Sequence, residues 1–157
     1  MSGNGSPTPD EAPDATGLRV VIVAGQWHEH IATGLVEGAS RYLDASRADW
    51  SVIRVPGSFE LPLGAKKALD SGADAVVALG VIIRGGTPHF EYVAQATTDG
   101  LTRVALESGK PVGFGVLTVD DEAQGLDRAG LDGSKEDKGA EAAHAAIDLA
   151  LTLRQWD

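Results

Sequence analysis

An apolar run in the middle of the chain ends in the short polar segment RGGTPH, whose residue types suit anion binding and proton transfer. Gly85 and Gly86 lack a Cβ atom, so the backbone there can approach a ligand closely. Thr87 as N-cap and Pro88 as the first helical residue favour the start of a helix, whose free amides and dipole would attract an anion. His89 would stand in the first turn, where an imidazole can transfer protons near neutral pH. The segment therefore predicts an anion site beside an acid–base residue, although a simple glycine turn with a surface histidine explains it equally well.

Other residues that could bind a ligand follow two further apolar runs or lie on later segments. Trp27 offers a flat face for a planar ring, but by residue type alone a core tryptophan is the commoner role. Glu60, in the stretch GSFE, presents a carboxylate at a helix start, which the helix dipole alone would also explain. Arg128 and Lys138 are typical solvated residues by themselves. They gain interest because an anion site in an acidic protein needs a cation.

The elements that must position these residues alternate between two patterns. Apolar, β-branched runs predict strands at 18–25, 50–57, 73–83 and 110–119. Helical spacing predicts helices at 28–45, 58–72, 87–108, 122–129 and 137–155. Such alternation is typical of an α/β protein with a parallel sheet covered by helices on both faces. Ligands of these sheets bind beyond the carboxyl ends of the strands. That edge would hold 25–28, 56–60, 81–89 and 114–121.

Length and composition limit the number of domains and the classes of function that are open to this protein. The 157 residues suffice for one domain with a proper core. A net charge of −10 argues against a nucleic-acid surface, and no apolar run has the length of a membrane span. The chain has no cysteine, which suits a cytoplasmic protein. Residues 1–16 are rich in Pro, Gly, Ser and acids and contain no apolar block for a secretory signal, so we expect a disordered tail before a domain at 17–157.

Four stretches, taken together and in this order, resemble the lumazine synthase family of riboflavin biosynthesis: VPGSFELPLGAKKAL, ALGVIIRGGTPHFEYV, GVLTVDDEAQGLDRAG and DKGAEAA. The resemblance covers about residues 18–154. It implies a flavodoxin-like three-layer sandwich with a four-stranded parallel sheet. It also implies a transferase that joins 5-amino-6-(D-ribitylamino)uracil to 3,4-dihydroxy-2-butanone 4-phosphate, giving 6,7-dimethyl-8-ribityllumazine, phosphate and water. No metal and no cofactor would be needed.

The same resemblance implies roles for individual residues. His89 would transfer protons. The phosphate of the ketose would be bound by Gly85, Gly86, Thr87 and Arg128. The uracil compound would be bound or enclosed by Trp27, Ser58, Phe59, Glu60, Val81, Ile82, Ile83 and Phe114. Lys138 would bind substrate near the mouth of the site. The family further implies a homopentamer with sites between subunits, in which the neighbouring subunit supplies Phe114 and Arg128.

Two departures and three alternatives accompany this interpretation. Gly25 stands where many family members carry Ser or Asn, and the acids Asp120 and Asp121 replace a stretch that is more often Thr- and Asn-rich. A flavin- or nucleotide-binding module could use the same fold class. A phosphosugar isomerase or aldolase could use the same anion site, and a shell protein could have lost catalysis. The resemblance leaves open whether pentamers assemble further.

Overall fold

The structure of the protein, a computed structural model, describes residue 5 and residues 11–157. Its sheet has four parallel strands in the order β2-β1-β3-β4. The strands are β1 (Arg19–Gly25), β2 (Asp49–Val55), β3 (Ala75–Ile83) and β4 (Val112–Val119). The helices are α1 (Glu29–Ala45), α2 (Leu61–Asp70), α3 (His89–Ser108), α4 (Glu122–Leu126) and α5 (Lys138–Leu153), with 3₁₀ turns at Ser58–Glu60 and Arg154–Trp156. The predicted α/β fold class is confirmed.

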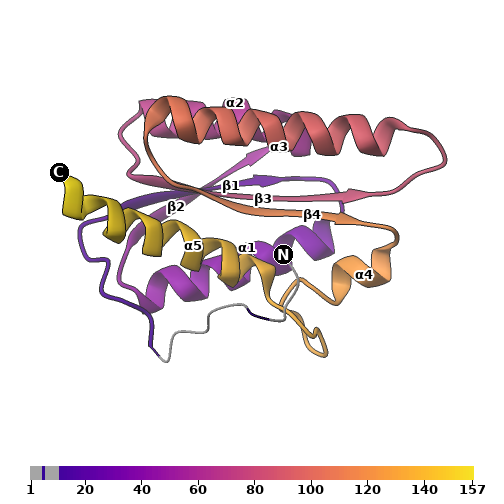
Figure 1. The fold of residues 1–157 in the computed structure, drawn as a ribbon. Coiled ribbons are helices and arrows are strands. Elements are labelled where there is room, and N and C mark those ends of the chain that lie inside the picture. Colours follow the sequence, from indigo (N-terminus) through magenta and orange to yellow (C-terminus); the bar gives the residue numbers. More distant parts are fainter. Residues whose placement is uncertain (1–4, 6–10) are drawn as a thin grey trace.

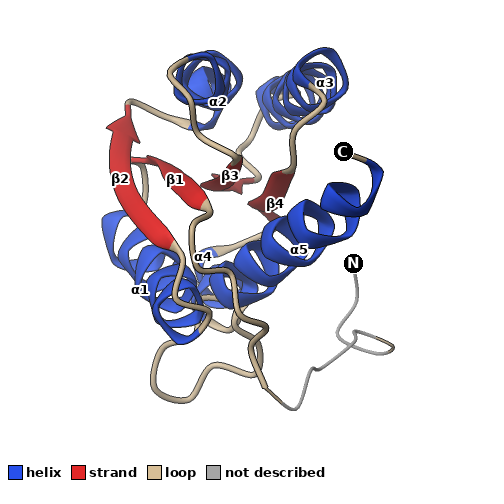
Figure 2. Cartoon of the chain, turned by 90° about the vertical axis from the view of Figure 1, so that its left-hand side faces the viewer, coloured by secondary structure: helices blue, strands red, loops and turns tan. Residues whose placement is uncertain are grey.

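The helices form two layers around the sheet (Figure 1). Seen along the sheet, α2 and α3 lie on one face, and α1, α4 and α5 lie on the other (Figure 2). This is the three-layer sandwich that the sequence predicts. The chain passes from β1 outward to β2 and then returns to β3 on the other side of β1, so the order reverses between β1 and β3. In open parallel sheets such a reversal opens a crevice at the carboxyl ends of the strands.

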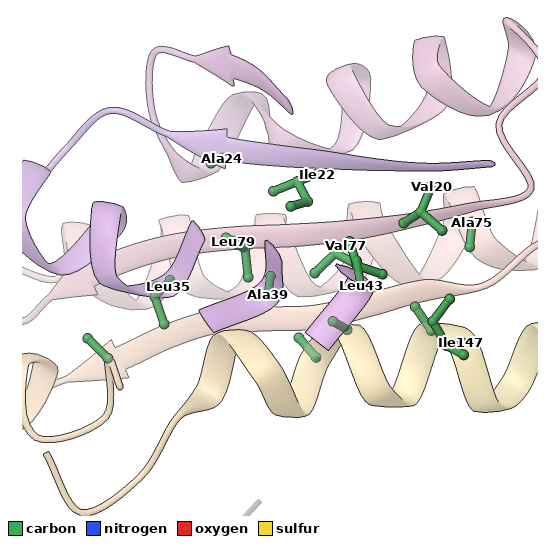
Figure 3. Packing of buried hydrophobic residues seen from close by; sticks show 14 of the residues in the cluster. Val20, Ile22, Ala24, Leu35, Ala39, Leu43, Ala75, Val77, Leu79 and Ile147 are labelled. Atoms are coloured by element: carbon green, nitrogen blue, oxygen red, sulfur yellow. The ribbon is translucent and has the colours of Figure 1, made fainter. Parts of the chain in front are cut away.

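Both faces of the sheet bury apolar side chains, which explains why its strands are nearly continuous apolar runs. The larger cluster fills the space between the sheet and helices α1 and α5. Figure 3 shows its labelled members: Val20, Ile22, Ala24, Leu35, Ala39, Leu43, Ala75, Val77, Leu79 and Ile147. A second cluster packs the opposite face of the sheet against α2 and α3. Two cores on a common sheet hold the strand ends as a rigid platform.

The connection from β3 to α3 extends past the ends of the strands (Figure 1). Helix α3 begins at His89, with Pro88 in the N-cap position. The expected order, Thr87 as N-cap and Pro88 as the first helical residue, is therefore one residue too early. The hydroxyl of Thr87 still serves the helix start, because it accepts a hydrogen bond from the His89 amide at 3.4 Å. Assigned helix ends commonly differ by this much.

The N-terminal segment makes ordered contacts before the expected domain start at residue 17. Ala15 is fully buried, and its amide donates to the Ser46 carbonyl at 2.7 Å. Asp14 accepts hydrogen bonds from the amide and the hydroxyl of Thr16. The contacts of the domain thus include residues 14–16, while 1–4 and 6–10 of the expected tail lie outside the described residues.

Across the described part of the chain, no helix combines the length and the apolar character that crossing a bilayer requires.

Candidate active site

The carboxyl ends of β1 and β2 bring Trp27 and Glu60 together over the backbone of Gly57. A Cβ atom on Gly57 would lie 2.9 Å from Cδ1 of Trp27 and 3.4 Å from Oε2 of Glu60. The indole therefore packs directly on a glycine that the sequence interpretation did not single out. Trp27 is 67% exposed, so the reading of it as a core tryptophan is wrong. An exposed indole fixed against a backbone can stack on a planar ring.

The three predicted binding residues in the 3₁₀ turn after β2 differ in their exposure to solvent. Phe59 is 64% exposed and Glu60 is exposed, so both side chains face solvent. Ser58 is buried, and its hydroxyl lies against Gly80 on β3, where no side chain would fit. Its carbonyl accepts a hydrogen bond from the buried hydroxyl of Thr97 at 3.1 Å. Ser58 and Thr97 thus fix the turn that presents Phe59 and Glu60.

The three predicted binding residues at the end of β3 differ in how deeply they are buried. Val81 and Ile82 are buried in the two opposite cores, whereas Ile83 is only partly buried. Ile83 is therefore the most solvent-exposed of the three, although it still packs against the larger cluster. The other two anchor the strand that leads into the RGGTPH segment.

The segment after β3 has the open geometry that an anion site needs. Gly85, Gly86, Thr87 and His89 are all exposed. A Cβ atom on Gly85 or Gly86 would have no atom within 4 Å, so space for a ligand adjoins both residues. This space lies at the amino-terminal end of α3, next to the Thr87 hydroxyl and His89, where the helix dipole favours an anion.

Arg84, to which the sequence interpretation assigned no role, braces this segment. Its guanidinium contacts Asp120 at 3.0 Å and Glu91 at 3.4 Å and lies 4.5 Å from the centre of the Phe90 ring. Its amide donates to the Val119 carbonyl at 2.9 Å. The hydrogen bonds that the guanidinium donates to these carboxylates, first of all to Asp120, raise the pKa of Arg84 despite some desolvation. Arg84 therefore connects residues 85–89, the predicted anion segment, to the end of β4 and the start of α3.

The two acids that depart from the family pattern already have partners. Asp120 pairs with Arg84, and Asp121 caps α4 by accepting a hydrogen bond from the Gln124 amide at 2.9 Å. Their negative charges are thus partly neutralised by contacts within the chain.

A second group of predicted residues lies along the outer edge of β4. Phe114, Arg128 and Lys138 line a cavity of about 250 Å³, whose remaining wall is residues 115–119. Phe114 is 48% exposed and pairs in register with Ala78, toward the amino-terminal half of the sheet. None of the residues at the ends of β1, β2 and β3 lines this cavity. The predicted site residues thus fall into two groups, which we call the strand-end group and the β4-edge group.

The two cations of the β4-edge group are held by contacts within the chain. Glu136 pairs with Arg128 and with Lys138, each at 3.5 Å, and Glu141 pairs with Lys138 at 2.7 Å. The Lys138 side chain is only 15% exposed, so the expectation of a solvated loop lysine is wrong. Desolvation lowers its pKa, but the carboxylates of Glu141 and Glu136 outweigh this and raise it above the usual value. Lys138 therefore remains a cation at neutral pH.

Fold and site together define a flavodoxin-like α/β protein whose predicted anion segment is open to solvent at the carboxyl ends of the strands. Comparison with known proteins narrows this class. The family model for 6,7-dimethyl-8-ribityllumazine synthase matches residues 17–154. A 6,7-dimethyl-8-ribityllumazine synthase of Leifsonia xyli subsp. xyli is 74% identical over 154 residues, covering 98% of each chain. One from Clavibacter michiganensis subsp. michiganensis is 66% identical over 155 residues, covering 98% of this chain and 97% of the relative.

The chain belongs to the 6,7-dimethyl-8-ribityllumazine synthase family, the transferases of riboflavin biosynthesis.

Proposed function

We propose that this protein condenses 5-amino-6-(D-ribitylamino)uracil with 3,4-dihydroxy-2-butanone 4-phosphate to form 6,7-dimethyl-8-ribityllumazine, phosphate and water. Family membership at 74% identity over nearly the whole chain is the observation that carries this proposal. The exposed residues at the strand ends support it, because they offer a ring platform, an anion segment and a proton-transfer residue. As in the family generally, we propose that the enzyme acts in the cytoplasm.

In the proposed reaction the protein acts mainly by placing its two substrates together. Gly85, Gly86 and Thr87 would hold the phosphate through backbone amides and a hydroxyl, with Arg128 as its cation. Trp27 would stack on the uracil ring, beside Phe59 and Glu60. Fixing two reactants in this way can be worth about 7 kcal/mol of the activation barrier.

His89 would transfer the protons that the reaction moves. The amine of the uracil compound adds to the ketose carbonyl and water leaves. Phosphate is then eliminated, and the ribityl-bearing amine closes the ring on the remaining carbonyl with loss of a second water. A positioned imidazole contributes about a hundredfold or more to such steps. We therefore expect His89→Ala to slow turnover by about a hundredfold without abolishing it, because substrate placement is retained.

We propose further that the active enzyme is a homopentamer whose sites combine the strand-end group of one subunit with the β4-edge group of the next. The division of the site residues into two groups supports this arrangement. Large apolar side chains are exposed in both groups, including Trp27, Phe59 and Phe114. A ring of identical chains joins two different surfaces at each contact, as this pairing requires.

The direct test is incubation of the purified protein with both substrates, followed by product absorbance and phosphate release. Formation of the lumazine, dependent on both substrates, would support the proposal. Neither product nor phosphate release from a folded protein would refute it. A flavin-binding module would instead purify yellow and reduce reversibly, and a Schiff-base aldolase would be trapped on a lysine by borohydride with the ketose.

A further inference from the structure

We propose that Glu136 is a positioning residue for the phosphate of the ketose substrate, because it holds Arg128 and Lys138 side by side at the β4-edge cavity. The inference rests on the proposed function for the identity of the anion. It concerns a carboxylate to which neither the sequence motifs nor the family resemblance assigns a role.

The backbone fixes the three residues relative to one another. Residues 127–130 and 136–138 run antiparallel, with an isolated bridge between Ala129 and Asp137. The Glu136 amide donates to the Asp127 carbonyl at 3.0 Å, and the Lys138 amide donates to the Arg128 carbonyl at 2.9 Å. Glu136 therefore stands on a closed, hydrogen-bonded segment that it shares with both cations, rather than on a free loop.

The carboxylate of Glu136 uses its two oxygens on two different cations. Oε2 lies 3.5 Å from Nε of Arg128, and Oε1 lies 3.5 Å from Nζ of Lys138. Two like charges on adjacent segments repel each other, and a shared carboxylate offsets that repulsion. It also reduces the number of rotamers available to two long side chains, which an incoming phosphate would otherwise have to order.

The position of Glu136 leaves the cations open to the cavity. Arg128 and Lys138 line it, and Glu136 does not. The guanidinium of Arg128 donates from Nη1 to the Gln124 carbonyl at 2.9 Å and faces Glu136 with Nε. Nη2 has no hydrogen-bond partner among the described residues. Glu136 and the Gln124 carbonyl thus restrain the guanidinium from two sides while a donor remains for an anion.

The alternative role for such a carboxylate is competition, in which Glu136 occupies the cations and a phosphate must displace it. The two roles predict opposite signs. Loss of the charge weakens phosphate binding if Glu136 positions the cations, and strengthens it if Glu136 competes. The cavity lining favours positioning, because the carboxylate stands outside the space that the anion would enter.

The test compares Glu136→Gln with the unmodified protein, using inorganic phosphate in calorimetry and both substrates in steady-state kinetics. We expect phosphate affinity to fall about threefold, in the range of partly exposed ion pairs. The KM for the ketose phosphate should rise by a similar factor, while kcat and the KM for the uracil compound stay unchanged. Glu136→Asp, which keeps the charge but shortens its reach, should give an intermediate value.

Asp132→Asn serves as the charge control, because Asp132 is exposed in the same loop and makes no ion pair among the described residues. It should change phosphate affinity less than Glu136→Gln does. Equal or tighter phosphate binding by Glu136→Gln would overturn the inference, as would an equal rise in KM for both substrates. Calorimetry separates this result from the proposed function. Weaker phosphate binding in a protein that forms no lumazine would reject the reaction and retain the role of Glu136.

Discussion

The strand-end group and the β4-edge group differ in how their side chains are held. In the strand-end group, Trp27 and Phe59 are more than 60% exposed. Residues 85–87 adjoin open space, and the neighbouring cation Arg84 is paired with Asp120 and Glu91. In the β4-edge group, Arg128 and Lys138 are partly buried and are held by ion pairs with two glutamates. One group thus offers exposed surfaces and open space, and the other offers fixed positive charge. Neither group alone offers both the flat surface for a planar ring and the fixed cation for a phosphate.

This difference supports a site completed by two subunits. Monomeric proteins rarely leave large apolar patches exposed, and those that remain usually mark a contact. The open strand-end group and the Phe114 edge of the sheet would serve as the two unlike surfaces of the proposed ring. The predictions that follow test whether the two groups cooperate, and whether each contributes what its geometry implies.

The largest effect should come from mixing two parent variants that are each poorly active alone. His89→Ala damages only the strand-end group, and Arg128→Ala only the β4-edge group. If the mixed chains are refolded together at random, about a quarter of the subunit boundaries combine an intact His89 with an intact Arg128. Activity should therefore rise many times above the mean of the parents, measured as lumazine formation. Mixed rings seen by native mass spectrometry without this rise would show that both residues serve a site within one chain.

The next effect should separate the two substrates. Arg128→Ala removes the proposed cation of the phosphate, and we expect the KM for the ketose phosphate to rise by about tenfold to a hundredfold. Trp27→Ala removes the ring platform and should raise the KM for the uracil compound by about tenfold. Each variant should leave the other KM nearly unchanged, as measured by steady-state kinetics. Equal changes in both constants for both variants would contradict the division of labour between the groups.

The sequence predicted the fold well because each element depends on local pattern. The central strands β1 and β3 are apolar runs buried on both faces, and the ends of all four strands fall within two residues of the expected ones. The contacts that hold the site were not predictable, because they join residues far apart in the chain. Arg84 meets Asp120 across 36 positions, and Thr97 meets the Ser58 carbonyl across 39. The burial of Ser58 likewise depends on Gly80, which no local signal connects to it.

A smaller effect should distinguish a glycine that adjoins open space for a ligand from a glycine that is packed against other residues of the protein. Gly86→Ala places a methyl group in open space, so its melting temperature should not change. The methyl group would crowd the proposed phosphate, and we expect the KM for the ketose phosphate to rise by a few times, about 1 kcal/mol.

Gly80→Ala should behave in the opposite way. Its methyl group meets the Ser58 hydroxyl and Leu61, and overpacking of this kind costs about 1–3 kcal/mol of stability. Calorimetric melting and steady-state kinetics on both variants check the contrast. A destabilised Gly86→Ala would show that the segment is packed rather than open.

The smallest effect concerns the N-terminal residues, which belong to neither group. Deletion of residues 1–10 should change neither turnover nor stability, because no proposed site residue lies there. Deletion through residue 16 removes more, since Ala15 is buried and its amide donates to the Ser46 carbonyl. One such hydrogen bond contributes about 1 kcal/mol, so the longer deletion should lower the free energy of unfolding by at least that amount. Both KM values should nevertheless match those of the full chain, because the strand-end and β4-edge groups are retained. Denaturant unfolding and steady-state kinetics measure the two quantities on the same preparations. If the shorter deletion raised the KM for either substrate, a residue of 1–10 would have to be added to one of the two groups.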